Sequence, residues 1–230
     1  MNNYLSVIFA FLIFPSQGVL AQMVSNVEAI ETGGSLSHYN MIGKKRPAPE
    51  VSGNYYLFDD WVLADIQLEV DNLIKDQNIN LNANDGEIEI PYGDEVRTLN
   101  RSKIKSFEVE NRKFINGKYL DASTFKDTFF EVLEDGAVGV YCQYYTDLRP
   151  PTYVPGLAVG DQNYKVLIKK NYFIKVNSVL KGFENEKKGN LSYFENHAPT
   201  LKYIRSQKLR LNKIDDFIIA AEYYNNNNSN

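Results

Sequence analysis

Two pairs of adjacent carboxylates, Asp59-Asp60 and Asp215-Asp216, are the residues whose types and spacing come nearest to acid–base chemistry. The first pair precedes the single tryptophan, Trp61, and an aromatic ring beside carboxylates suits a sugar site. Successive side chains of a strand point to opposite faces, so the start of a strand explains Asp59 and Asp60 better than a shared substrate does. Asp215 and Asp216 fall in the first turn of a predicted helix, where the helix dipole favours anions. Neither pair is therefore assigned as catalytic.

The sequence contains few of the histidine and cysteine residues that bind metal ions or act as nucleophiles. The two histidines, His38 and His197, are far apart, and with one cysteine the chain cannot build a Cys/His zinc site. The oxygen-rich segment Asn82–Glu87 lacks the spacing of a calcium loop, which needs about a dozen residues, and its composition predicts a hairpin turn. No nucleophile elbow, S-x-x-K motif or glycine-rich phosphate loop occurs. We therefore predict no catalytic residue, no metal site and no cofactor.

The single cysteine, Cys142, follows a run of strand-forming residues. Alternation places it on the same face as Val138 and Val140. No histidine lies near it in the sequence, so a buried apolar residue is a better explanation than a nucleophile.

The aromatic residues, 16 Tyr and 13 Phe, are the part of the composition that most suggests a binding role. Tyrosines are paired at residues 55–56, 144–145 and 223–224. A flat apolar ring with a polar tip suits contacts with sugars or proteins. Strands also favour aromatic residues, so a β-rich core explains the same enrichment.

The charge balance argues against nucleic acid as a partner. Lys and Arg number 25 against 29 Asp and Glu, which gives a net charge of −4, and there is no long basic run. The cluster Lys44–Arg46 is explained as a solvated loop. Hydrophobic residues at 43% and charged residues at 23% are ordinary for a globular protein.

The first 21 residues predict a signal peptide. Residues 5–14 read LSVIFAFLIF, a run shorter than the roughly 20 residues that span a bilayer but typical of a secretory signal. Small residues precede Gln22, so we place cleavage after Ala21. The segment before the run has no Lys or Arg, which departs from the usual pattern, and the alternative is a buried N-terminal helix or strand. We expect export to the periplasm or the exterior, with no transmembrane anchor in the mature chain.

Residues 22–52 predict an extended lead-in, and residues 53–176 a β-rich domain. Alternation of period two predicts half-buried strands at 61–70, 78–83 and 87–90, with further strands at 95–99 and 103–109. Turn-forming dipeptides predict hairpins at Asn116-Gly117, Asp135-Gly136 and Lys170-Asn171. Prolines predict a loop over 147–161.

Residues 177–226 predict a helical region packed on the β domain. Apolar residues at helical spacing follow Asn177, a candidate N-cap, and Pro199 suits a first helical turn. Asn212 is the candidate cap of a final helix, whose apolar stripe consists of Ile214, Phe217, Ile218 and Ala221. A polar tail from Asn225 is expected to fray, with residues 227–230 disordered. The predicted fold class is α+β: about ten antiparallel, hairpin-connected strands and then a short helical region.

Several segments carry a resemblance that covers residues 53 to 226. They are GNYYLFDDW at 53–61, SKIKSFEV at 102–109, YKVLIKKNYFIKV at 164–176 and the final stretch from LKYIRSQ at 201 to EYYN at 225. The chain resembles a group of uncharacterised exported proteins of Bacteroidota. The resemblance implies export and this architecture, and it brings no activity and no ligand site.

Two functional hypotheses follow. The first is a non-enzymatic binding or structural protein of the cell envelope, with a protein or a glycan as its partner. The second is a secreted glycan or peptide hydrolase that uses carboxylates scattered in the sequence. The two differ in whether convergent carboxylates line a pocket.

Overall fold

The computed structural model describes residues 51–69, 72–120, 125, 128–154, 156–157 and 159–228. The predicted signal peptide with its cleavage site at Ala21 and Gln22 lies outside the described residues, as do His38, Lys44–Arg46 and the lead-in up to residue 50.

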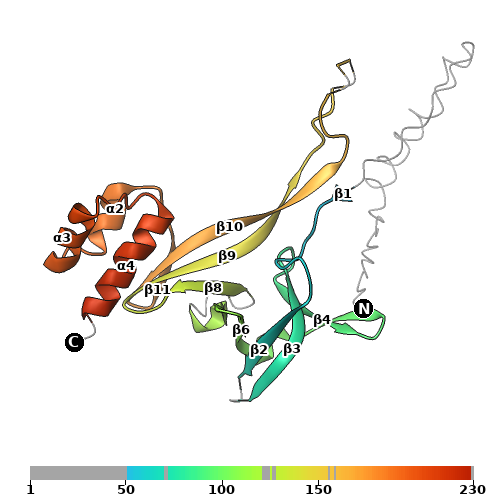
Figure 1. The fold of residues 1–230 in the computed structure, drawn as a ribbon, viewed down its shortest axis with the longest axis horizontal. Helices are drawn as coiled ribbons and strands as arrows, with labels where there is room; N and C mark the ends of the chain where they lie inside the picture. The colour runs from blue at the N-terminus through green and yellow to red at the C-terminus, as the bar shows by residue number, and fades with distance from the viewer. Residues whose placement is uncertain are drawn as a thin grey trace, which may run out of the picture. The chain divides into compact units, whose positions relative to one another are not determined.

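Over the described residues the chain is an α+β protein, a mostly antiparallel sheet followed by three helices, which confirms the predicted fold class (Figure 1). The strands are β1 (Val51–Ser52), β2 (Val62–Leu68), β3 (Leu73–Asn82), β4 (Glu87–Tyr92), β5 (Glu95–Thr98), β6 (Ile104–Val109), β7 (Arg112–Asn116), β8 (Phe129–Glu134), β9 (Val138–Arg149), β10 (Tyr164–Val176) and β11 (Val179–Gly182). The helices are α2 (Lys187–Ser192), α3 (Ala198–Ser206) and α4 (Ile214–Asn228), with short 3-10 helices η1 (Arg101–Lys103) and η2 (Gly117–Tyr119).

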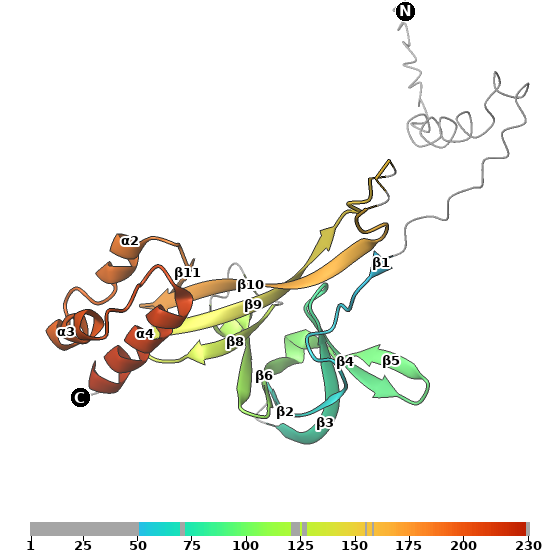
Figure 2. The same cartoon turned by 45° about the horizontal axis from the view of Figure 1, so that its top comes forward.

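The strand order is β1-β10-β9-β8-β7-β6-β2-β3-β4-β5, with β11 also paired to β10. Neighbours are antiparallel except β1, which runs parallel to β10. Strand β3 changes partner along its length, since residues up to Ile79 pair with β2 and residues from Asn80 pair with β4. Figure 2 shows the β4–β5 hairpin beyond this change of partner.

The predicted alternation places the apolar faces of the first strands inward. Ala64 and Ile66 of β2 and Ile79 and Leu81 of β3 are buried, as predicted. With Phe107 of β6 and neighbouring residues they form one hydrophobic cluster, which we call the strand core; its buried members are Phe58, Ala64, Ile66, Ile79, Leu81, Ala83, Ile88, Ile104, Phe107, Val109, Phe114, Phe129, Cys142 and Tyr144.

Strand β9 connects this core to the helices. Cys142 and Tyr144 belong to the strand core, whereas Val138 and Val140, which have the same parity along the strand, pack under the helices. The helix core consists of the buried residues Val138, Val140, Ile174, Phe194, Ile204, Leu211, Phe217, Ala220 and Ala221. On the other face of β9, Tyr141 packs in a small third cluster with Phe130 and Leu180. Because both faces of β9 are covered, its first residues, Val138 to Cys142, are all buried and mostly apolar.

The hairpin predicted at Asn116-Gly117 is wrong. Strand β6 turns into β7 at Glu110-Asn111, and Asn116 ends β7 and caps η2 by accepting the Lys118 N–H. Its amide also donates to the carbonyls of Arg101 and Ile104, so contacts with a distant segment decide its conformation. Gly117 is required by close approach, because a Cβ there would lie 2.2 Å from the Phe125 carbonyl oxygen.

The hairpin predicted at Lys170-Asn171 and the helix predicted from Asn177 are also wrong. Strand β10 runs without interruption from Tyr164 to Val176 against β9. The chain turns instead at Asn177 and Ser178, whose φ angles of 50° and 64° suit a two-residue hairpin. The residues that follow form β11.

The helices predicted after residue 198 agree with the structure more closely than the one predicted from Asn177. Pro199 lies in the first turn of α3, and Asp215 and Asp216 lie in the first turn of α4. Helix α4 begins at Ile214, so Lys213 rather than Asn212 directly precedes it. The predicted frayed tail from Asn225 is wrong over 225–228, because α4 continues to Asn228 and buries Asn225.

Candidate functional site

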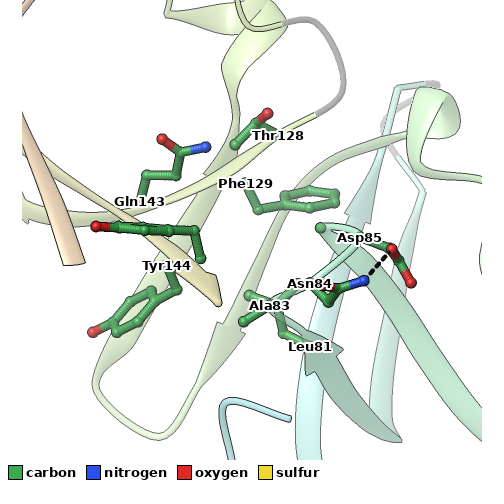
Figure 3. Close-up of a pocket in the computed structure, with 10 residues that line it drawn as sticks. Leu81, Ala83, Asn84, Asp85, Thr128, Phe129, Gln143 and Tyr144 are labelled. Atoms are coloured by element: carbon green, nitrogen blue, oxygen red, sulfur yellow. Dashed lines mark hydrogen bonds between the residues drawn. The ribbon is translucent and has the colours of Figure 1, made fainter. Parts of the chain in front are cut away.

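A small pocket lies where β8 begins and β9 continues past it, beside the turn between β3 and β4 (Figure 3). Its volume is about 170 Å³. Three segments distant in sequence line it, namely residue 81 with residues 83–86, residues 128–129 and residues 143–145. A larger hollow of about 540 Å³ lies beside α2, but one continuous stretch, residues 181–193, supplies its lining. Convergence of separate segments makes the smaller pocket the better candidate site.

The β3–β4 turn forms one wall because its residues are turn formers. Gly86 has a φ of 67°, and the Asn84 N–H donates to the Asn82 side chain at 3.0 Å. The Thr146 hydroxyl of β9 donates to the Asn84 side-chain oxygen at 2.9 Å, which ties the turn to the sheet. The segment considered for calcium is thus a hairpin turn, as predicted.

Strands β8 and β9 form the opposite wall. Gln143 pairs with Phe130 in register, so its side chain shares a face with that of Thr128, two residues before Phe130. Figure 3 shows the Phe129 ring directed from β8 toward the turn that carries Asn84 and Asp85. Within the described chain, the Gln143 amide, the Thr128 hydroxyl and the Tyr145 hydroxyl make no hydrogen bond to protein. Gln143 and Tyr145 lie on the face of β9 opposite Tyr144, so their polar groups and the Phe129 ring border the pocket from different faces of the sheet.

The lining can bind but is poorly equipped for acid–base catalysis. Among its described residues Asp85 is the one carboxylate, and the other polar groups are amides, hydroxyls and backbone. A glycosidase of the usual kind needs two carboxyl groups about 5–10 Å apart across the scissile bond.

A network of Arg112, Glu131 and Tyr144 lies next to the pocket, in the strand core. Arg112 donates to both Glu131 oxygens, at 2.7 and 3.2 Å, and to the Tyr144 oxygen at 3.0 Å. The Tyr144 hydroxyl donates to Glu131 at 2.5 Å. The guanidinium also lies 5.1 Å from the Phe114 ring centre and 5.3 Å from that of Phe58.

The protonation states of this network are those of a structural ion pair. Burial raises the pKa of Glu131, but the hydrogen bonds from Arg112 and Tyr144 outweigh it, so the net pKa lies below its ordinary value. Burial, followed by the hydrogen bond to Glu131, raises the pKa of Tyr144. Glu131 is therefore ionised and Tyr144 neutral at physiological pH, and neither is tuned to transfer a proton near neutrality.

Cys142 is buried on the predicted face, with 1% of its surface exposed. Burial, with the negative charge of Glu131, raises the pKa of its thiol to about 11. A protonated buried thiol fits the predicted packing role rather than a nucleophile.

His197 and the two acidic pairs lie apart from the pocket. The His197 ring caps α3 and lies 2.7 Å from the Thr200 hydroxyl. Asp59 and Asp60 are exposed before β2. Asp216 accepts the Arg210 N–H at 2.7 Å, so it stabilises the start of α4.

The tyrosine pairs serve mainly internal contacts. The Tyr56 hydroxyl donates to Glu89 at 2.5 Å, and this bond, with burial, raises its pKa to about 12. Tyr223 stacks on Tyr203 with ring centres 4.0 Å apart. Of the paired residues, only Tyr144 and Tyr145 line the pocket. Gln143, Thr128 and Phe129 were not singled out from the sequence, where no motif marks them.

Within the described ranges, no group of three or more His, Cys, Asp or Glu side chains could hold a metal ion. None of the helices there has the length and apolarity needed to cross a membrane.

No protein-family model matches the chain, and neither a curated protein nor a solved structure shows significant similarity to it.

Proposed function

We propose that this chain is an exported, non-enzymatic binding protein of the cell envelope, and that the pocket between the β3–β4 turn, β8 and β9 holds a neutral sugar unit of a glycan. The apolar run at 5–14 and the small residues before Gln22 support export. The sheet then serves as the scaffold that presents the pocket.

The proposal is carried by lining residues whose polar groups make no hydrogen bond within the described chain, with Gln143 and Tyr145 leaving β9 on the face opposite Phe129 and Tyr144. The Gln143 amide can donate and accept, and the Thr128 and Tyr145 hydroxyls can do the same. Sugar hydroxyls need partners of this kind, and an apolar sugar face suits an aromatic neighbour. A volume of about 170 Å³ is below that of pockets for drug-sized molecules, which limits the ligand to about one sugar unit.

The lining also favours binding over hydrolysis. Asp85 has no second carboxylate among the described pocket residues. Glu131, the nearest buried carboxylate, is neutralised by Arg112. A secreted hydrolase is the second hypothesis because the chain holds 29 acidic residues, and among the described ones Asp85 alone lines this pocket.

Saturation-transfer NMR with glucose, galactose and N-acetylglucosamine tests the proposal on the chain that begins at Gln22. We expect transfer from at least one sugar with a dissociation constant of ~1 mM, as suits one small site. Gln143→Ala removes one or two hydrogen bonds and should weaken binding about fivefold. Gln77→Ala, a half-buried glutamine of β3 outside the pocket, is the matched control.

Absence of transfer from every sugar, or equal binding by the Gln143→Ala variant, would contradict the proposal. Release of reducing ends from an oligosaccharide by the unmodified chain, with loss of that release in Asp85→Asn, would favour the hydrolase.

A further inference from the structure

The loop that joins β9 to β10 has an uncharged tip, which we define as residues 150–160, and its described large apolar side chains are exposed. Its sequence, PPTYVPGLAVG, contains no Asp, Glu, Lys or Arg. Leu157 exposes 73% of its surface, Val159 58% and Val154 49%. Leu148, at the end of β9, exposes 52%. Folded proteins seldom expose a cluster of large apolar side chains of this kind without a binding role.

The tip is carried on an ordered arm of β9 and β10, with the short strand β1 paired to β10 at Tyr164 and Lys165. Strands β9 and β10 pair without a register shift from Val138↔Val176 to Arg149↔Lys165. Strand β8 leaves β9 after Gln143, so beyond that point β9 has no further paired strand on that side, and Thr146 contacts the β3–β4 turn through Asn84. Figure 1 shows the hairpin continuing past β8 to the loop. The arm therefore holds the tip clear of both the strand core and the helix core.

Many of the described backbone N–H groups of the tip donate hydrogen bonds to carbonyl groups of the same loop. The Thr152 and Tyr153 N–H groups donate to the Asp161 carbonyl, and the Val154 N–H donates to the Val159 carbonyl at 2.9 Å. The Leu157 N–H donates to the Val154 carbonyl at 3.1 Å. Three of the eleven tip residues are prolines, which carry no N–H. Such saturation lowers the cost of moving the tip out of water.

Basic residues outnumber acidic ones in the strands that carry the tip, although Asp161 directly follows it. Arg149 and Lys165 lie directly opposite each other in register, and like charges in that position repel. Neither has an ion-pair partner within the described residues, whereas Lys169 pairs with Asp147. Between residues 147 and 170 four basic side chains stand against two acidic ones, in a chain of net charge −4.

We propose that the tip inserts into the interfacial region of a lipid bilayer that contains anionic phospholipids. Leu157, Val154 and Val159 enter the acyl boundary, and Arg149 and Lys165 lie at the level of the headgroups. Apolar insertion supplies affinity, and the basic pair supplies the preference for negative lipids. A partner that adds a strand to the tip would instead need unpaired backbone, and the tip's own hydrogen bonds reduce what it offers.

Vesicle co-sedimentation tests this inference independently of sugar binding. The protein begins at Gln22, because the apolar run at 5–14 would itself partition into lipid. One set of vesicles contains equal parts of phosphatidylglycerol and phosphatidylcholine, and the other contains phosphatidylcholine alone. We expect binding to the first set that weakens with added salt.

The double substitution Leu157→Asp with Val159→Asp should reduce binding about tenfold or more, because it removes the apolar contact and adds negative charge. The substitution Val96→Asp is the matched control, since Val96 is 51% exposed on β5 and belongs to another hairpin. Each variant is accepted only if its circular dichroism and thermal midpoint match those of the unmodified chain. Failure of the unmodified chain to bind the anionic vesicles, or equal binding by the tip variant, would overturn the inference.

Discussion

Substitution of Asn225 by alanine tests how the last helix is joined to the sheet. The Asn225 side chain is buried on α4. It forms hydrogen bonds with the backbone of Val138, as a neighbouring strand would. Its oxygen accepts the Val138 N–H at 3.0 Å, and its amide donates to the Val138 carbonyl at 3.1 Å. The same amide donates to the Glu134 carboxylate at 2.7 Å and to the Asp135 carbonyl at 3.2 Å. One side chain thus holds the β8–β9 turn against the helix.

The expected loss of stability follows from the backbone groups that Asn225→Ala leaves without a hydrogen-bond partner. Val138 is 1% exposed, so its N–H and C=O lose their partner in a place where water enters poorly. Each unsatisfied buried group costs about 1–3 kcal/mol, and we expect a total loss of about 3 kcal/mol in the free energy of unfolding. For a chain of this length that lowers the thermal midpoint by roughly 6–12 °C.

The assay is thermal and urea unfolding of the chain from Gln22, followed by circular dichroism. Asn226→Ala is the control, because Asn226 is the next residue of the same helix and is exposed. A midpoint for Asn225→Ala within about 2 °C of the control would refute the assignment of Asn225 as the joining residue.

A second substitution examines the same contact from the turn. Gly136 has a φ of 142°, and a Cβ there would lie 2.6 Å from the Asn225 side-chain carbon. Gly136→Ala should therefore destabilise through backbone strain and through the clash. In the Asn225→Ala background the clash is relieved while the strain stays, so the cost of Gly136→Ala should fall in a double-mutant cycle. Strictly additive costs would show that the two residues do not interact.

Three further predictions concern the cores. Phe217→Asp, or removal of residues 213–230, should destabilise the sheet as well as the helices, because Phe217 is fully buried in the helix core; calorimetry that finds an unchanged midpoint would make α4 an independent appendage. Cys142 should react slowly with a thiol reagent in the folded protein and rapidly after denaturation, since burial raises its pKa to about 11; fast labelling of the native state would place it on the surface. The folded-state pKa of Glu131 is lowered, so its ion pair with Arg112 stabilises the fold above the ordinary pKa of a glutamate, and this stabilisation is lost as the pH falls through the lowered value. Glu131→Gln should flatten the acid limb of a plot of midpoint against pH, and an unchanged acid limb would contradict that role.

Local patterns were sufficient wherever one face of an element is buried and the other is wet. The alternation in β2 and β3 correctly predicted that Ala64, Ile66, Ile79 and Leu81 are buried. The apolar stripe of α4 was predicted in the same way from Phe217 and Ala221, and both are buried. The hairpin at Asp135-Gly136 was also correct, because Gly136 adopts a positive φ between β8 and β9.

Turn propensity failed where a distant segment offered the same residues better contacts. Asn116-Gly117 has the composition of a tight turn, yet the Asn116 amide binds the carbonyls of Arg101 and Ile104, and Phe125 packs against Gly117. The chain does not turn at Lys170-Asn171, because twelve residue pairs in register hold β10 straight against β9. In both cases a gain spread over several tertiary contacts outweighs a local preference.

The candidate pocket could not be predicted, because its walls come from segments that only the fold brings together. The β3–β4 turn was recognisable from its Asn, Asp and Gly residues. Nothing in the sequence marks Gln143 or Thr128, since an isolated polar residue in a strand gives no sign of whether it faces solvent, a partner or a cavity. The same holds for the arm, whose tip is visible as an uncharged run but whose exposure depends on where β8 leaves β9.

The sequence by itself determined the class of this protein, because strand and helix periodicities are set by neighbours two to four residues apart and survive without any knowledge of the fold. The export signal stays a prediction, made from a short contiguous run at the start of the sequence. Only the tertiary structure decided that Asn225, in a polar run that suggested a frayed tail, is a buried joining residue. Its partners, Val138 and Glu134, lie 87 and 91 residues away in the chain, and a hydrogen bond over that separation leaves no periodic trace in the sequence.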